Sequence, residues 1–122
     1  MKKTFALLLV TFITFNLRAQ LSDTKWTGKL NIEGGMDVVF RFSNDTLEVS
    51  NPAGGESIET MKYTTTDSVM TLEKLYGNSQ CDTSLGQYKY VISGNQMTLS
   101  LISDNCADRA GAIGTMKLEK KE

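Results

Sequence analysis

Apolar and polar residues alternate along most of the chain after residue 25, as they do in β-strands that bury one face. The segment 36–42 is typical, with one face formed by Met36, Val38, Phe40 and Phe42. No stretch after residue 25 shows the helical repeat of an amphipathic helix convincingly. The pattern predicts eight short strands, at 26–32, 36–42, 47–49, 58–65, 68–75, 87–93, 96–102 and 112–119.

Turn residues separate these strands at short intervals. Gly94-Asn95 suits a two-residue hairpin turn, because both residues tolerate a positive φ. That turn places Ser93 opposite Gln96 and Tyr88 opposite Leu101. The two strands therefore have a predicted register as well as predicted positions.

Short connections without crossover helices favour sequential antiparallel neighbours. Eight strands in up-and-down order suffice to close a small barrel. We therefore expect an all-β fold, an eight-stranded antiparallel up-and-down β-barrel, with a two-sheet sandwich as the alternative. Ile58 is out of phase with Met61 and Tyr63, so we expect a bulge or an irregular start of the strand there.

The start of the chain is different, because an unbroken run of apolar and hydroxyl-bearing residues spans 5–15 after Met1-Lys2-Lys3. This run has the length of a signal-peptide core and is shorter than the roughly 20 residues of a membrane-spanning helix, the alternative reading. We expect a signal peptide at 1–19, cleaved after Ala19, and one domain at 20–122. Without a cysteine at the cleavage point to carry a lipid, the mature protein is expected in the periplasm or outside the cell, not in a membrane.

The net charge of the mature chain disfavours some classes of binding partner. The leader holds three of the 13 lysine and arginine residues and none of the 14 acidic ones, so the mature chain is more acidic than the whole-chain net charge of −1. Such a surface argues against nucleic acid or an anionic membrane as a partner. We expect a monomer.

Cys81 and Cys106 are the only cysteines in the sequence, and in an oxidising compartment they most simply pair with each other. Two free thiols or a metal-binding pair are the alternatives. A zinc site would need carboxylates to complete it, because the chain has no histidine.

Three segments resemble the lipocalin-like domains of the calycin type, in the small form that bacteria secrete. They are Asp23-Thr24-Lys25-Trp26-Thr27-Gly28, the hairpin that runs from Gly86 to Leu101, and Asp104-Asn105-Cys106-Ala107-Asp108-Arg109. In that family the tryptophan lies at the closed end of the barrel and a basic side chain packs across it. The resemblance implies that Trp26 and Arg109 are in contact and close the barrel, with a stacking attraction of about 0.5 to 2 kcal/mol.

The sequence also departs from the family. Thr24 takes the glycine position of the family's Gly-x-Trp, and no flanking C-terminal helix is expected because the chain stops at Glu122.

The chemistry of the residues does not favour an enzyme. Without histidine there is no histidine-based triad or general base. The aspartates fall mostly in expected turns, which leaves a glycosidase-type carboxylate pair as a remote alternative. Asp104, Asn105 and Asp108 could be calcium ligands, but they lack the spacing of a known loop motif, so turn or capping roles are favoured. We expect no catalytic residue, metal or cofactor.

Two functions remain. The first is a binding module that holds a small apolar or amphipathic ligand in the barrel, with the site toward the tyrosines. Its expected lining is Leu30, Met36, Val38, Phe40, Tyr63, Tyr88, Tyr90, Leu99 and Met116. The second is a filled barrel that acts through its surface, as an inhibitor or an interaction domain. A cavity discriminates between them.

Overall fold

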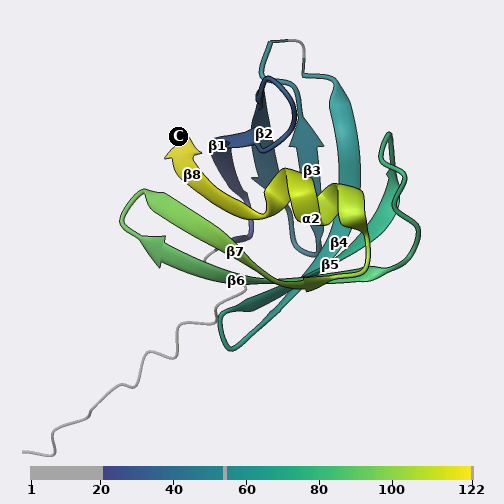
Figure 1. Ribbon diagram of the computed structural model, residues 1–122. Coiled ribbons are helices and arrows are strands. Elements are labelled where there is room, and N and C mark those ends of the chain that lie inside the picture. The colour runs from purple at the N-terminus through teal and green to yellow at the C-terminus, as the bar shows by residue number, and fades with distance from the viewer. Residues whose placement is uncertain (1–20, 54, 122) are drawn as a thin grey trace, which may run out of the picture.

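The protein is described by a computed structural model, which places residues 21–53 and 55–121 (Figure 1). These residues form eight strands and one short helix. The elements are β1 (Thr24–Leu30), β2 (Met36–Phe42), β3 (Thr46–Ser50), β4 (Ser57–Thr66), β5 (Val69–Gly77), β6 (Leu85–Ser93), β7 (Gln96–Asp104), α2 (Ala107–Ile113) and β8 (Thr115–Lys121).

The strands form one closed antiparallel barrel in the order in which they follow one another along the chain. The first and last strands close it, from the pair Lys25–Lys121 to the pair Thr27–Glu119. The predicted up-and-down barrel is confirmed, and the sandwich alternative is wrong. The predicted hairpin register is also confirmed, with Ser93 opposite Gln96 and Tyr88 opposite Leu101.

The irregularity expected at Ile58 is present as a bulge at the start of β4. Val49 pairs with Glu59 and Ser50 pairs with Ser57, so Ile58 is the additional residue of β4. Beyond it, Glu59, Thr60 and Met61 are all buried, although strict alternation would bury every second residue. Glu59 pairs with the buried Val49 and is in phase with Met61 and Tyr63, so regular alternation places its carboxylate on the inner side of the barrel.

An apolar core fills much of the barrel. Trp26, Phe40, Phe42 and Tyr88 are its largest fully buried side chains, and each comes from an inward position of its strand. Phe42 and Tyr63 pack edge to face, with ring centroids 5.1 Å apart.

The sequence-based prediction was wrong between residues 107 and 114, because α2 lies where the last strand was expected to begin. The helix follows Cys106, which is extended, and ends at Gly114, whose φ is +36° and whose N–H donates to the carbonyl of Ala110 at 2.9 Å. Its two buried side chains are Arg109 and Ile113, four residues apart. An apolar-periodicity argument misses this helix, since half of its buried stripe is an arginine and it has only two turns.

The expected signal peptide and its cleavage site lie outside the described residues. Within residues 21–53 and 55–121, no helix is long and apolar enough to cross a membrane.

Candidate functional site

A pocket of about 460 Å³ lies between α2 and the inner wall of the barrel. It occupies the end at which β1, β3 and β5 finish, and Figure 1 shows α2 crossing this end of the barrel. The barrel contributes four apolar inward side chains, and the helix contributes two more: Leu30, Phe40, Val49 and Met61, with Ala112 and Ile113. The interior of the pocket is therefore mainly apolar.

The rim of the pocket mixes apolar and polar side chains. Ile32 and Met36, at the β1–β2 turn, line the pocket and are 43% and 37% exposed. Glu59, Asn78, Ser79, Asp108 and Arg109 supply the polar part of the lining.

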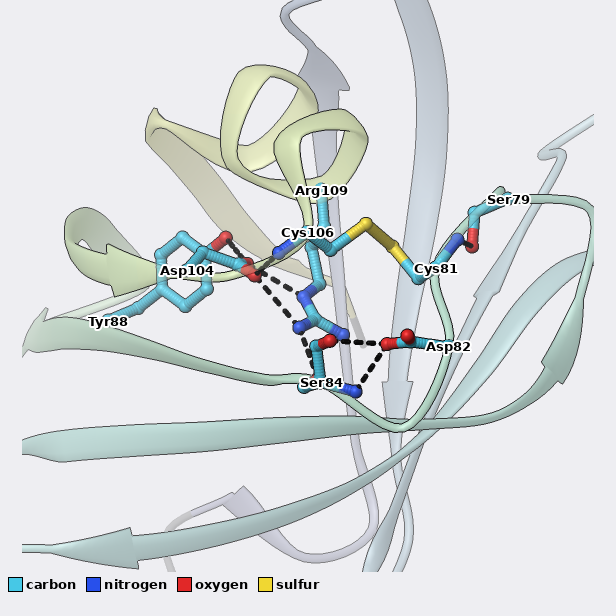
Figure 2. A network of polar contacts seen from close by, with 8 residues as sticks. All are labelled: Ser79, Cys81, Asp82, Ser84, Tyr88, Asp104, Cys106 and Arg109. Carbon is cyan, nitrogen blue, oxygen red and sulfur yellow. Dashed lines mark hydrogen bonds and ion pairs between the residues drawn. A yellow bond between two sulfur atoms is a disulfide. The ribbon is translucent and has the colours of Figure 1, made fainter.

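Arg109 and Asp104 form a buried ion pair beside the pocket (Figure 2). The guanidinium donates from Nε to Asp104 Oδ2 at 2.7 Å and from Nη2 to Oδ1 at 2.9 Å. Nη2 also donates to the carbonyl of Ser84 at 2.7 Å. Arg109 thus connects the helix to the end of β7 and to the loop before β6.

Asp104 accepts further hydrogen bonds from the Tyr88 hydroxyl and from the Cys106 N–H, the latter at 2.8 Å. Burial alone would raise the pKa of the Asp104 carboxyl, but the bonds from Arg109, Tyr88 and Cys106 outweigh it and hold that pKa below its usual value. Burial, and then the bond to Asp104, raises the pKa of Tyr88. Desolvation opposes the charge of Arg109, yet Asp104 keeps its pKa above the ordinary value. At neutral pH the pair is ionised, and Tyr88 is neutral.

The Cys81–Cys106 disulfide lies next to this network, as Figure 2 shows. Its Cα atoms are 5.5 Å apart, which confirms the predicted pairing. Cys81 belongs to the loop between β5 and β6, and Cys106 immediately precedes α2. The bridge therefore holds two walls of the pocket, the loop and the helix, at a fixed separation.

A second polar group stands at the start of β4. The Glu59 carboxylate accepts from the Ser79 N–H at 3.0 Å through Oε2, and its Oε1 lies 3.6 Å from Lys74 Nζ. Lys74 in turn donates to the Ser79 carbonyl at 2.7 Å. Glu59 and Lys74 together hold the loop at Ser79 against the barrel.

The structure divides the expected lining residues into two groups. Leu30, Met36 and Phe40 line the pocket. The other six are buried in the packed core and are not part of its wall: Val38, Tyr63, Tyr88, Tyr90, Leu99 and Met116.

Two of the three tyrosines that were expected to line the site donate hydroxyl hydrogen bonds within the protein. The Tyr63 hydroxyl donates to the Ser43 carbonyl at 2.6 Å, and the Tyr88 hydroxyl donates to Asp104. The Tyr90 hydroxyl is buried without a hydrogen-bond partner among the described residues. Burial raises the pKa of Tyr90, an effect that the Thr65 hydroxyl reduces. The described pocket lies elsewhere, beneath α2.

Trp26 and Arg109 were expected to be in contact, but each side chain bonds to another partner. The Trp26 indole N–H donates to the Thr24 hydroxyl at 2.9 Å, near the start of β1, whereas α2 lies at the end where β1 finishes. The described part of the chain holds no arginine–aromatic stacking pair, and the guanidinium is bound to Asp104 and Ser84. Asp104, not Trp26, is the partner of this arginine.

Sequence reasoning missed Glu59, Met61 and the helical residues of the pocket. Glu59 had one usable signal, since it alternates in phase with Met61 and Tyr63, whose side chains share one face of the strand. The helix left no comparable signal.

The alternative of calcium at Asp104, Asn105 and Asp108 finds no support in the geometry. Both oxygens of Asp104 accept hydrogen bonds from protein donors. Among the described residues, no group of three or more acidic or cysteine side chains is arranged to hold a metal ion.

Comparisons of the chain with protein-family models, with curated proteins and with solved structures return no match. The barrel is compatible with a lipocalin-like fold.

Proposed function

We propose that this protein binds a small apolar or amphipathic molecule in the pocket beneath α2. The observation that carries the proposal is the pocket itself, since about 460 Å³ of mainly apolar space remains in a barrel whose interior is otherwise well packed. Small-molecule sites typically have roughly 300–1,000 Å³ and a few polar groups on an apolar wall. The pocket meets both criteria.

The surroundings of the pocket support a preformed site. The disulfide and the Arg109–Asp104 pair hold α2, and Glu59 with Lys74 holds the loop at Ser79. Walls that are fixed before binding lower the ordering cost that a ligand would otherwise meet. The partly exposed Ile32 and Met36 provide apolar surface where a ligand would enter.

The proposal is a binding protein, not an enzyme. Asp104 and Arg109 neutralise each other, and the four polar contacts to Asp104 hold it as a structural group. We further propose that the protein is a secreted or periplasmic monomer of the lipocalin-like type. A disulfide fits that compartment, and the basic, then apolar, start of the sequence fits a leader.

Titration with the apolar dye N-phenylnaphthylamine tests the proposal. The wild-type protein is expected to raise the dye's fluorescence in a saturable manner. Ala112→Trp fills the pocket from the helix and is expected to abolish that rise. Ala107→Trp is the matched control, because Ala107 is exposed on the same helix and lies outside the pocket wall.

Equal binding by wild type and Ala112→Trp would refute the proposal, as would the absence of saturable binding by the wild type. Circular dichroism of each variant checks that the fold is retained.

One observation favours the second candidate, a protein-interaction function. β5 pairs with β6 only from Val69 to Glu73, so its end at Leu75 and Tyr76 has no strand on that side. These two side chains are 50% and 64% exposed, and an apolar open edge is able to pair with another chain. This candidate would be favoured if the wild type did not bind the dye and if a protein that binds the wild type no longer bound the Tyr76→Asp variant.

A further inference from the structure

One oxygen of the buried Glu59 carboxylate has no hydrogen-bond donor within the described residues. Glu59 is 9% exposed and lines the pocket, and its Oε1 is shielded from water. Oε2 already accepts from Ser79, and Lys74 Nζ, 3.6 Å from Oε1, directs a proton to the Ser79 carbonyl instead. A buried acceptor without a donor is unfavourable, so a ligand that supplies one gains binding free energy.

The remaining charges of the pocket wall are not balanced. Arg109 is neutralised by Asp104, and Lys74 lies beside Glu59. Asp108 also lines the pocket, and within the described chain it has no ion pair or side-chain hydrogen bond. The wall and its immediate partners thus carry an excess of negative charge.

The arginine does not offset this excess toward a ligand. Figure 2 shows the guanidinium directed to Asp104 and Ser84, and three of its hydrogen bonds go to these two residues. The third guanidinium nitrogen, Nη1, is buried without a hydrogen-bond partner in the described chain, but a carboxylate that reached it would meet a guanidinium whose charge Asp104 already neutralises. The same carboxylate would also meet the charges of Glu59 and Asp108 in the pocket wall. The geometry therefore disfavours an anionic ligand such as a fatty acid.

We propose that the pocket selects an amphiphile with a cationic amine head group, with Glu59 as the recognition residue and Asp108 as a second negative charge. This inference rests on the proposed binding function. The apolar tail would lie along Met61, Val49 and Ile113, and the ammonium group would donate to Glu59 after a small rotation of the carboxylate, whose terminal torsion is soft. A charge-assisted hydrogen bond of this kind is stronger than a neutral one.

Calorimetric titration with decylamine, decanol and decanoate tests the inference, because the three probes share one tail and differ in the head group. Wild type is expected to bind decylamine about tenfold or more tightly than decanol, and decanoate most weakly. Glu59→Gln keeps the shape of the side chain and is expected to remove most of the preference for the amine. The control Glu119→Gln removes an exposed carboxylate of β8, which is not part of the pocket, and is expected to leave the preference intact.

Asp108→Asn provides a second test in case Glu59→Gln fails to fold, because Asp108 is exposed and is expected to tolerate the change. It is expected to lower decylamine affinity a few-fold and to leave decanol affinity unchanged. Equal affinities for the three probes, or tightest binding of decanoate, would overturn the inference and leave the binding function standing. Binding of none of the probes would overturn both.

Discussion

Arg109 and Asp104 form an ion pair that is almost completely shielded from water, with side-chain exposures of 4% and 0%. They are five residues apart, but one belongs to α2 and the other to the end of β7. The pair, with Tyr88 and the Cys106 N–H, connects the helix to the sheet. This relationship positions the outer wall of the pocket.

Replacement of Arg109 is expected to destabilise the protein strongly. Arg109→Ala leaves the Asp104 carboxylate buried without its cation, a change that typically costs about 3–5 kcal/mol. Urea unfolding gives the free energy of unfolding. Arg41→Ala, at an exposed position of β2, is the control and is expected to change it by less than about 0.5 kcal/mol. A similar small loss for both variants would contradict the role of the pair.

The native fluorescence of the Trp26 indole provides a separate check on the same variant. Because the indole is bound to Thr24 and not to Arg109, its emission maximum in folded Arg109→Ala is expected to match the wild type. A shifted maximum in the folded variant would instead favour the stacking that the family resemblance implied.

Acid is expected to weaken the fold through Asp104. Its pKa is lower in the folded protein than the value of about 3.9 in an unfolded chain, so the unfolded state takes up the proton first. The stabilising effect is complete above about pH 4–5 and is lost as the pH falls through the folded-state pKa. Urea unfolding at pH values from about 6 to about 2 should show a shallower decline for Asp104→Asn than for wild type. Parallel declines would contradict this assignment.

Alkali is expected to weaken the fold through Tyr88. Burial raises the pKa of its hydroxyl above the ordinary value of 10.0, so the unfolded chain releases the proton first and stability falls as the pH rises above about 10. Tyr88→Phe is expected to cost about 1 kcal/mol at neutral pH, through the lost bond to Asp104, and to reduce the alkaline loss. Part of the alkaline loss of stability is expected to persist in this variant, because the pKa of Tyr90 is also raised. An unchanged alkaline slope would count against Tyr88.

Two glycines give a matched test of the packing around the ion pair. A Cβ at Gly86 would collide with the Asp104 carboxylate and lie 2.9 Å from Arg109 Nε, so Gly86→Ala is expected to cost about 2 kcal/mol or more. At Gly111, on α2, a Cβ meets nothing within 4 Å, and Gly111→Ala is expected to stabilise the helix by about 0.5–1 kcal/mol. Thermal unfolding of both variants measures the difference. An unchanged melting temperature for Gly86→Ala would contradict the close contact between Gly86 and the Arg109–Asp104 pair.

The disulfide is expected to stabilise the whole domain. Its cysteines are 25 residues apart, and closing such a loop contributes about 3–4 kcal/mol in the chain-entropy account. The double variant Cys81→Ser/Cys106→Ser should lose about that much in urea unfolding. Intact mass after alkylation, with and without reductant, should show one intramolecular bridge in wild type, and two alkylated thiols without reductant would contradict it.

The barrel could be predicted from sequence because each strand carries its own signal. Alternation specifies which face is buried, and Gly94-Asn95 specifies the β6–β7 register. Even the bulge at Ile58 is visible, since Ile58 breaks the phase of Met61 and Tyr63.

The pocket could not be predicted in the same way. It depends on α2, whose inner face consists of Arg109 and Ile113 and therefore lacks an apolar stripe. Alternation also shows only that Tyr63, Tyr90 and Leu99 point inward, not that they pack against one another and leave no space. The position of the free space is a property of all the strands and the helix together.

Intermolecular nuclear Overhauser effects between bound N-phenylnaphthylamine and the protein's methyl groups test the central claim most directly. The account predicts contacts to Val49, Met61 and Ile113, which line the pocket beneath α2. Contacts to Met97 and Leu99 in the packed core, or none from a saturated sample, would contradict it.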